Sequence, residues 1–296
     1  MGYTDITQVG EHTYVIPAPV NVGIYEYDGE AVLIDSGNDK EAGRQILKTL
    51  TERGWNLRLI VNTHSNADHI GGNNFLQEKT GCSIAATAEE AMFIRFPRLE
   101  PAFLYGGFPL SLLRNKFLEA KPSEVAYEIE PEGPIFDTGL EAVPLPGHFF
   151  DMIGVRTPDN VLFVADSLFS ERIIGKYHLF YIFDVDRYLK TLSFLEKTRA
   201  ELFVPSHAEP ARDISSLILK NREQITDTLS RILEICEIPV STETIFEKLC
   251  SHYGIRVDMN QYVLVSNTVK SHLGYLADKG QIEPVTKIGQ LRWQRV

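Results

Sequence analysis

The chain has 296 residues, of which 44% are hydrophobic, and a formal net charge of −11 at pH 7. This length and apolar content suffice for one large domain and a smaller one, with a sizeable buried core. Residues 1–212 carry the whole negative excess, while residues 213–296 hold ten basic and ten acidic residues. The distribution argues against a basic nucleic-acid-binding surface in either part.

Cysteine usage and the N-terminal residues predict a soluble, cytoplasmic protein. Cys82, Cys236 and Cys250 are far apart and form no C-x-x-C motif, which favours a reducing compartment over a disulfide framework. Residues 1–10 lack the apolar core of a signal peptide. No apolar run approaches the roughly 20 residues that span a bilayer, so we expect no membrane association.

The first part of the chain predicts strands that lead to a cluster of polar side chains. Residues 14–17, 20–27 and 31–34 have strand patterns, residues 39–53 have helical spacing, and residues 57–61 form a buried strand. The next segment, 62–74, reads N-T-H-S-N-A-D-H-I-G-G-N-N and places His64, Asp68 and His69 directly behind that strand. Two imidazoles and a carboxylate at a strand end favour a divalent metal that prefers nitrogen and oxygen ligands. Asn66 lies where a third imidazole would be expected.

A helix over 72–79 and a strand over 83–86 precede an apolar insert, residues 88–120. Prolines and glycines divide this insert, so it predicts several short pieces instead of one long helix. Its aromatic residues, Phe103, Tyr105 and Phe108 among them, suit a lid or a pocket wall beside the metal loop. The alternative is that they pack the insert onto the domain or form a homodimer contact.

Further candidate ligands follow the strands of a second half-sheet. Strand patterns occur over 125–129, 135–136, 141–145, 152–157, 161–165 and 202–205, with a helix over 186–199. His148, Asp166 and His207 each come directly after one of these apolar runs. Residues 168–183 should overhang the site, and Tyr177 and His178 there are candidate substrate contacts, either as proton donors or as an aromatic wall without chemistry.

The character of the chain changes after Pro210. Residues 213–237, 244–252 and 259–279 predict helices, and residues 282–295 predict a β-hairpin that turns near Ile288 and Gly289. This order resembles a winged helix-turn-helix, whose second helix can enter a DNA groove. The segment is neutral and that helix offers only Lys270 and Lys279 as cations. We therefore expect a packing, dimerising or substrate-covering role and no nucleic-acid partner.

Taken together, the motifs resemble those of the metallo-β-lactamase fold superfamily. The defining H-x-H-x-D-H motif is present as His64-Ser65-Asn66-Ala67-Asp68-His69, and Leu33 to Gly37 is similar to the family's L-I-D-T-G strand end. The resemblance covers about residues 4–212. It implies an α+β fold, a four-layer αβ/βα sandwich over residues 1–212, followed by the winged-helix-like segment 213–296.

The same resemblance implies a two-metal site at the edge of the sandwich. One metal would be held by His64, the residue at position 66 and His148, the other by Asp68, His69 and His207, with Asp166 bridging. Asn66 departs from the family pattern. Its amide oxygen can ligate, but it is neutral and a poorer partner for zinc than imidazole, so we expect an intact second position and a weakened first one.

The chemistry of such a site is hydrolysis. A bound divalent ion lowers the pKa of water from ~15.7 to ~7 and polarises the scissile group, so no protein nucleophile is required. Asp68 would orient or deprotonate this water. We expect one or two zinc ions, with iron or manganese as alternatives, and a small ester, thioester, lactone or phosphoester substrate that has an apolar portion.

Two other functions fit parts of the pattern. His64, His148 and Asp166 form the two-histidine, one-carboxylate set of mononuclear iron oxygenases, and persulfide dioxygenases of this superfamily resemble that arrangement. A degenerate metal domain that senses a ligand, joined to a DNA-binding winged helix, would be a regulator. Metal analysis would separate the first alternative from a hydrolase, and salt-sensitive duplex binding would support the second.

Overall fold

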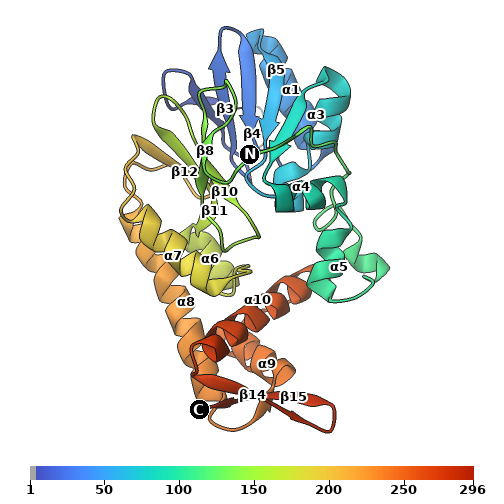
Figure 1. The fold of residues 1–296 in the computed structure, drawn as a ribbon, viewed down its shortest axis with the longest axis vertical. Coiled ribbons are helices and arrows are strands. Elements are labelled where there is room, and N and C mark those ends of the chain that lie inside the picture. Colours follow the sequence, from blue (N-terminus) through green and yellow to red (C-terminus); the bar gives the residue numbers. More distant parts are fainter. Residues whose placement is uncertain (1–4) are drawn as a thin grey trace.

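Two β-sheets face each other (Figure 1). Apolar side chains from both sheets form one buried cluster. The computed structural model describes residues 5–296, so Met1 to Thr4, the start of the N-terminal stretch considered above, lie outside the described residues. The first sheet has the strand order β1(Thr7–Gln8), β2(Thr13–Ile16), β3(Val22–Tyr27), β4(Glu30–Ile34), β5(Asn56–Val61), β6(Ser83–Ala86) and β7(Tyr127–Glu128). Its first four strands are antiparallel and the pairs from β4 onward are parallel.

The second sheet contributes the other part of this cluster. Its order is β12(Leu202–His207), β11(Val161–Phe169), β10(Ile153–Arg156), β9(Glu141–Pro144) and β8(Gly133–Pro134). The pairs are antiparallel except for β11 with β12, which are parallel. All nine residues of β11 are buried, because this strand is covered on both faces.

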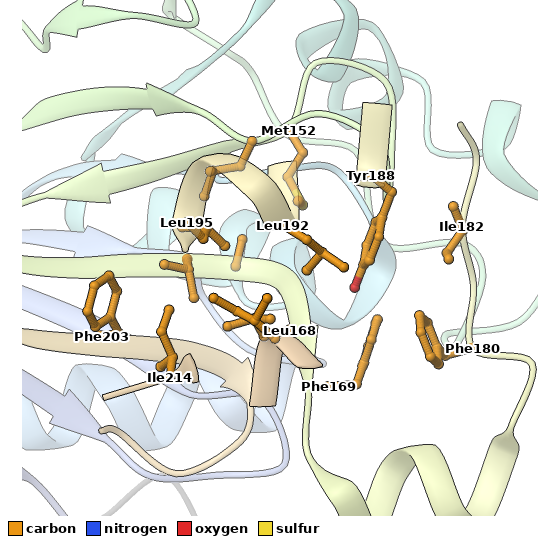
Figure 2. Packing of buried hydrophobic residues seen from close by; sticks show 14 of the residues in the cluster. Met152, Leu168, Phe169, Phe180, Ile182, Tyr188, Leu192, Leu195, Phe203 and Ile214 are labelled. Atoms are coloured by element: carbon orange, nitrogen blue, oxygen red, sulfur yellow. The ribbon is translucent and has the colours of Figure 1, made fainter. Parts of the chain in front are cut away.

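Helices cover the outer face of each sheet. On the first sheet, α1(Lys40–Arg53), α3(Asn73–Thr80) and α4(Ala88–Arg95) bury Ile46, Leu76 and Ile94 against the strands. On the second sheet, α7(Val185–Leu195) and α8(Ser215–Ile235) form a core with β11, and Figure 2 shows Leu192 and other members of that core. Helix, sheet, sheet and helix are the four layers predicted from the sequence, and that prediction is confirmed.

Helix α1 shows how local sequence sets these boundaries. The Asp39 side chain accepts a hydrogen bond from the Ala42 backbone N–H, which caps the first turn. Ile46 and Leu50 recur on one face and are fully buried. Gly54 ends the helix with φ of 70°, a conformation that glycine adopts without steric cost.

The insert consists of short pieces, as predicted. After α4 come α5(Leu99–Tyr105) and a single 3₁₀ turn, η1(Ser111–Leu113). Leu104 and Leu113 pack in one cluster with Phe149, Tyr181 and Val263. The insert is therefore held between the second sheet's loops and the C-terminal segment.

The C-terminal segment has its own sheet and core. It comprises the end of α8 and then β13(Val240–Ser241), α9(Thr242–Tyr253), α10(Met259–Asp278), β14(Ile282–Lys287) and β15(Gln290–Arg295), with the sheet order β13-β15-β14. The hairpin turns at Ile288 and Gly289, as predicted. The assignment of this segment as a winged helix stays a prediction.

Helix α10 packs on the rest of the molecule. In Figure 1 it runs from the C-terminal sheet towards α5, and it contacts α5, η1 and α7. Asn115 of the insert donates a hydrogen bond to Asn260 across 2.9 Å, and Lys279 pairs with Asp186 of α7 at 2.9 Å. The helix that would read DNA in a winged helix-turn-helix is thus engaged with the insert and with α7.

Several predicted boundaries are wrong. Strand β11 extends to Phe169, four residues beyond its predicted end at residue 165, so Asp166 lies within the strand and not after it. The expected strand over residues 135–136 is a turn, in which Phe136 has φ of 52°, and the pairing strand β8 lies just before it because Gly133 faces Ala142. Helix α7 ends at Leu195, four residues before the predicted end.

All three cysteines are free thiols. Among residues 5–296, no helix combines the length and apolar character needed to cross a bilayer.

Candidate metal centre

The six histidines and aspartates predicted as ligands converge from several elements into two adjacent groups. The first group contains His64, His148 and Asp166, and the second contains Asp68, His69 and His207; within each, the candidate ligand atoms lie within 4.8 Å of one another. We call these groups the first and second metal positions. The contributing segments are the loop after β5, the four-residue helix α2(Ala67–Ile70), the loop after β9, and strands β11 and β12.

Asp166 lies between the two positions. Its Oδ2 atom is 3.5 Å from His148 Nε2 and 3.2 Å from His207 Nε2, and its Oδ1 atom is 3.3 Å from His69 Nε2. The strand carries register shifts around Ala165, which has φ of 49°. Such irregularities turn a side chain out of the regular ladder, and here the carboxylate faces ligands of both groups.

Asp68 lies beside both histidines of the second metal position. The Asp68 carboxylate lies 3.5 Å from His207 Nε2 and 4.0 Å from His69 Nε2. Its side chain is 42% exposed, whereas that of Asp166 is 5% exposed. Solvent therefore reaches the centre from the side of Asp68.

Hydrogen bonds fix the same tautomer in all four histidines. The Nδ1 atom of His69 donates to Asp35 at 2.8 Å, that of His148 to the Tyr181 carbonyl at 3.0 Å, and that of His207 to the Pro19 carbonyl at 3.1 Å. These acceptors carry no proton, so Nδ1 must supply it.

For His64 the acceptor is the Thr63 hydroxyl, at 3.1 Å. That hydroxyl donates its own proton to Asp35 at 2.7 Å, so it accepts from the imidazole. In the neutral form of each ring, Nε2 is therefore the nitrogen that carries a lone pair, and it is directed at the neighbouring ligands.

Three buried atoms in the two metal positions have no hydrogen-bond partner in the described part of the chain. Among residues 5–296, His64 Nε2, His69 Nε2 and Asp166 Oδ1 are buried and make no hydrogen bond. Buried polar atoms are normally satisfied. Bare imidazole nitrogens beside carboxylate oxygens match the ligand preference of Zn²⁺, Fe²⁺ and Mn²⁺, and the residues present fit a divalent cation.

Electrostatics differ between the two positions. Burial, reinforced by the nearby His69, holds the pKa of His64 well below its usual value, and burial also lowers the pKa of His148. Burial opposes protonation of His207 too, but Asp166 and Asp68 outweigh it and raise its pKa to about 10. The carboxylates thus create a negative potential at the second position that attracts a proton or a metal cation.

Asn66 occupies the edge of the first metal position. Its Oδ1 atom is 2.9 Å from His148 Nε2, and its Nδ2 atom donates a hydrogen bond to Glu100 at 2.8 Å. The amide that replaces the expected imidazole therefore reaches the centre.

The loop that carries His148 depends on the glycine before it. Gly147 has φ of 126°, and a Cβ atom there would lie 2.3 Å from the Tyr188 backbone nitrogen of α7. Only glycine permits both this conformation and this approach. The His148 loop is therefore fixed to the helix behind it.

Comparison with known proteins gives the family of this site. A sequence profile described as "Metallo-beta-lactamase superfamily" matches residues 15–207, which include all six predicted ligands. The chain belongs to the metallo-β-lactamase superfamily. The ligand order inferred from the sequence is thus found on the fold that the resemblance implied.

Curated relatives in the superfamily match only part of the chain. A hydroxyacylglutathione hydrolase from Cereibacter sphaeroides is 32% identical over 143 residues, which cover 48% of this chain and 44% of that protein. One from Rhodopseudomonas palustris is 29% identical over 154 residues, covering 51% and 49%. The chain thus spans about half the length of the curated relatives that it matches.

Some solved structures match nearly the whole chain. A beta-lactamase domain protein from Burkholderia ambifaria gives a TM-score of 0.76 at 21% identity and covers 99% of this chain and 94% of its own. A metallo-beta-lactamase family protein from Thermus thermophilus also gives 0.76, at 18% identity, covering 96% and 99%. At this identity the likeness shows the fold.

The predicted substrate-contact residues are scattered. Phe103 packs against other aromatic rings, including Phe149 next to His148. Tyr105 is exposed and Phe108 is 83% exposed. Tyr177 accepts a hydrogen bond from Lys176, and His178 stacks on Tyr253 of α9 with 5.0 Å between ring centroids. Phe103 thus contacts the residue that follows the candidate ligand His148. His178 contacts the C-terminal segment instead.

Sequence reasoning missed the acidic residues behind the ligand loop. Glu90 of α4 accepts hydrogen bonds from the N–H and hydroxyl groups of Ser65 and from the N–H of Asp151. Burial raises its pKa to about 7. Glu100 of α5 accepts from Asn66. The sequence does not distinguish these two glutamates, because the insert also contains Glu89, Glu119 and four basic residues among its apolar groups.

Proposed function

We propose that this chain is a metal-dependent hydrolase of a small ester, thioester, lactone or phosphoester substrate. The observation that supports it most strongly is the convergence of four histidine Nε2 atoms, whose rings are held through Nδ1, on the carboxylates of Asp68 and Asp166. When bound, divalent cations supply a Lewis acid and lower the pKa of water. The protein's part is to hold these ligands rigidly and to leave one side open.

Asp68 is the proposed catalytic residue. Burial raises its pKa, but His69 and His207 outweigh that effect and lower it overall, so the carboxylate stays ionised at neutral pH. It is the more exposed of the two ligand carboxylates and lies beside His207 at the open side. It can therefore orient a water molecule and accept its proton.

Thioesters are the substrate class that we place first. The curated relatives named hydroxyacylglutathione hydrolases share about half of this chain at roughly 30% identity. Because the match covers only half of each protein, the acyl and thiol groups of the substrate are left to measurement. Zinc is the proposed metal at the second position, because two imidazoles and two carboxylates suit it.

A panel of substrates tests this proposal. The purified protein, with and without a strong chelator, is assayed on a hydroxyacylglutathione thioester, an aryl ester, a homoserine lactone and an aryl phosphodiester. We expect hydrolysis of at least one substrate that chelation abolishes and added Zn²⁺ or Mn²⁺ restores. Asp68→Ala should remove it, and Glu89→Gln, at an exposed site of α4, should not. Activity that survives both chelation and Asp68→Ala would refute the proposal.

The iron dioxygenase alternative is supported by the first metal position alone. His64, His148 and Asp166 form a two-histidine, one-carboxylate set. The second position has its own complete set, Asp68, His69 and His207, which a mononuclear enzyme does not need. Oxygen consumption with a persulfide substrate by iron-loaded protein, without ester or thioester hydrolysis, would favour the dioxygenase.

We propose that residues 213–296 support the site and do not bind DNA. Helix α10 packs against α5 and α7, and Lys279, one of its two cations at the predicted reading face, is paired with Asp186. A mobility-shift assay on mixed duplexes at low and physiological salt is the test. Binding that weakens with salt and saturates below the micromolar range would overturn this view.

A further inference from the structure

The insert delivers one buried carboxylate to the metal centre. Glu100 lies in α5 and is 4% exposed. Its Oε1 atom accepts a hydrogen bond from the Asn66 side-chain amide at 2.8 Å, across 34 residues of sequence. Helix α5 is itself held by contact with α10 and by the packing of Leu104 with Phe149. The position of the carboxylate is therefore fixed by tertiary packing.

This hydrogen bond sets the direction of the Asn66 amide. The Asn66 NH₂ group donates to Glu100 Oε1, so Oδ1 points the other way. Oδ1 then faces His148 Nε2 at 2.9 Å. Because His148 donates from Nδ1 to the Tyr181 carbonyl, its Nε2 atom also carries a lone pair. Two lone pairs meet with no proton between them.

A shared cation accounts for this contact. Metal–ligand distances of about 2.0–2.2 Å place neighbouring ligand atoms roughly 3 Å apart around one ion. His64 Nε2, buried and without a hydrogen-bond partner among residues 5–296, belongs to the same position. The amide oxygen therefore stands as a ligand of the first metal position, beside His64, His148 and Asp166.

We propose that Glu100 is the positioning residue that makes Asn66 a metal ligand, so that the insert completes the first metal position. An outer hydrogen-bond partner fixes the orientation of a ligand and increases its basicity, and an amide whose N–H is bound by a carboxyl group is the better oxygen donor. Loss of imidazole at position 66 is thereby offset by a residue of α5. This inference rests on the metal centre of the proposed function.

The first experiment counts and titrates metal. Wild type, Glu100→Leu, Glu100→Gln and the matched exposed control Glu89→Leu are loaded with Zn²⁺ alone; bound zinc is measured by elemental analysis and affinity by competition with a chelating dye. Wild type should bind two ions. Glu100→Leu should lower the affinity for the more weakly bound ion by about 10- to 100-fold. The affinity for the more tightly bound ion should not change. Glu100→Gln keeps an accepting oxygen and should retain most of the affinity.

A double-mutant cycle separates orientation from packing. Asn66→Asp supplies a carboxylate, which has no amide direction to lose, so adding Glu100→Leu should cost less than about threefold there. An equal loss in both backgrounds would show that Glu100 acts by packing and would overturn the inference. Two ions bound with wild-type affinity by Glu100→Leu, or only one ion bound by wild type, would overturn it as well.

One further variant tests the inference if Glu100→Leu does not fold. Asn66→Leu removes the proposed ligand and leaves Glu100 in place, and it must bind one ion fewer than wild type; equal counts refute the inference. The outcomes are separable from those of the proposed function. Two bound ions without hydrolysis of any substrate would refute the function alone, whereas hydrolysis with two ions retained in Asn66→Leu would refute this inference alone.

Discussion

Asp35 accepts the Nδ1 proton of His69 across 2.8 Å. The same carboxylate accepts hydrogen bonds from the backbone and hydroxyl groups of Thr63, and it is 2% exposed. It therefore ties the end of β4 to both the ligand loop and the second metal position. Carboxylate partners of this kind hold the tautomer and orientation of metal-binding histidines.

Replacing this carboxylate should impair the second metal position. In Asp35→Asn, the new NH₂ group would face His69 Nδ1, which favours the tautomer protonated at Nε2 and blocks that ligand atom. We expect zinc affinity at this position to fall by about 10- to 100-fold. Chelator competition measures the affinity, and long-range ¹H–¹⁵N NMR reads the tautomer. Asp137→Asn, at an exposed ion pair, is the control and should change neither.

The ligands of the second position should be individually necessary. Asp68→Ala and His207→Ala each remove one of three atoms that lie within 4.8 Å of one another. Each variant should therefore lose the ion at this position and with it the hydrolytic activity. Elemental analysis after dialysis checks the count. Full metal content in either variant would disprove the assignment.

Gly147→Ala should disturb the loop that carries His148. The added methyl group would meet the Tyr188 backbone at 2.3 Å, and φ of 126° is strained for alanine. We expect a loss of at least about 2 kcal/mol in unfolding free energy and weaker binding at the first metal position. Gly175→Ala is the control, because nothing lies within 4 Å of that site in α6(Glu171–Tyr177); it should be neutral or slightly stabilising.

Buried His272 should make stability depend on pH. It lies in α10 at 1% exposure and donates a hydrogen bond from Nδ1 to the Thr268 carbonyl, and burial lowers its pKa to about 4. The unfolded chain has the ordinary pKa near 6.5, so it binds more protons than the folded chain between pH 4 and 6.5. The stability that this group contributes is complete above about pH 6.5 and is lost as the pH falls towards about 4.

Urea unfolding at pH 7 and pH 5 measures this effect. Wild type should lose about 2 kcal/mol through His272 over that interval. His272→Leu should lose that much less than wild type, whereas His252→Gln, at an exposed site of α9, should behave as wild type does. A pH dependence identical in His272→Leu and wild type would contradict the expectation.

Much of the fold and of the candidate ligand set was predictable because it depends on local pattern. The apolar runs of β5 and β11 and the capped helix α1 are local signals, and the ligand motif has fixed spacing. The strand at residues 135–136 was misplaced because two apolar residues look like a strand, while pairing with β9 selects Gly133 and Pro134.

The residues that act through tertiary contact were not predictable in this way. Glu100 meets Asn66 only because α10 and the aromatic cluster hold the insert against the His148 loop. Asp35 was recognised as part of a strand-end motif, but its role behind His69 requires two strands to be adjacent. Neither of these contacts produces a periodic pattern in the sequence.

Helix α8 joins the two halves of the molecule as a single rod of 21 residues. Ile225 packs under the second sheet, and Ile232, two turns later, packs in the C-terminal core. Unfolding of either core would disrupt the helix that also packs in the other core. The two halves should therefore unfold together. The two tryptophans, Trp55 and Trp293, stand in opposite halves. Fluorescence of Trp55→Phe and Trp293→Phe variants should therefore report the same denaturant midpoint from either end.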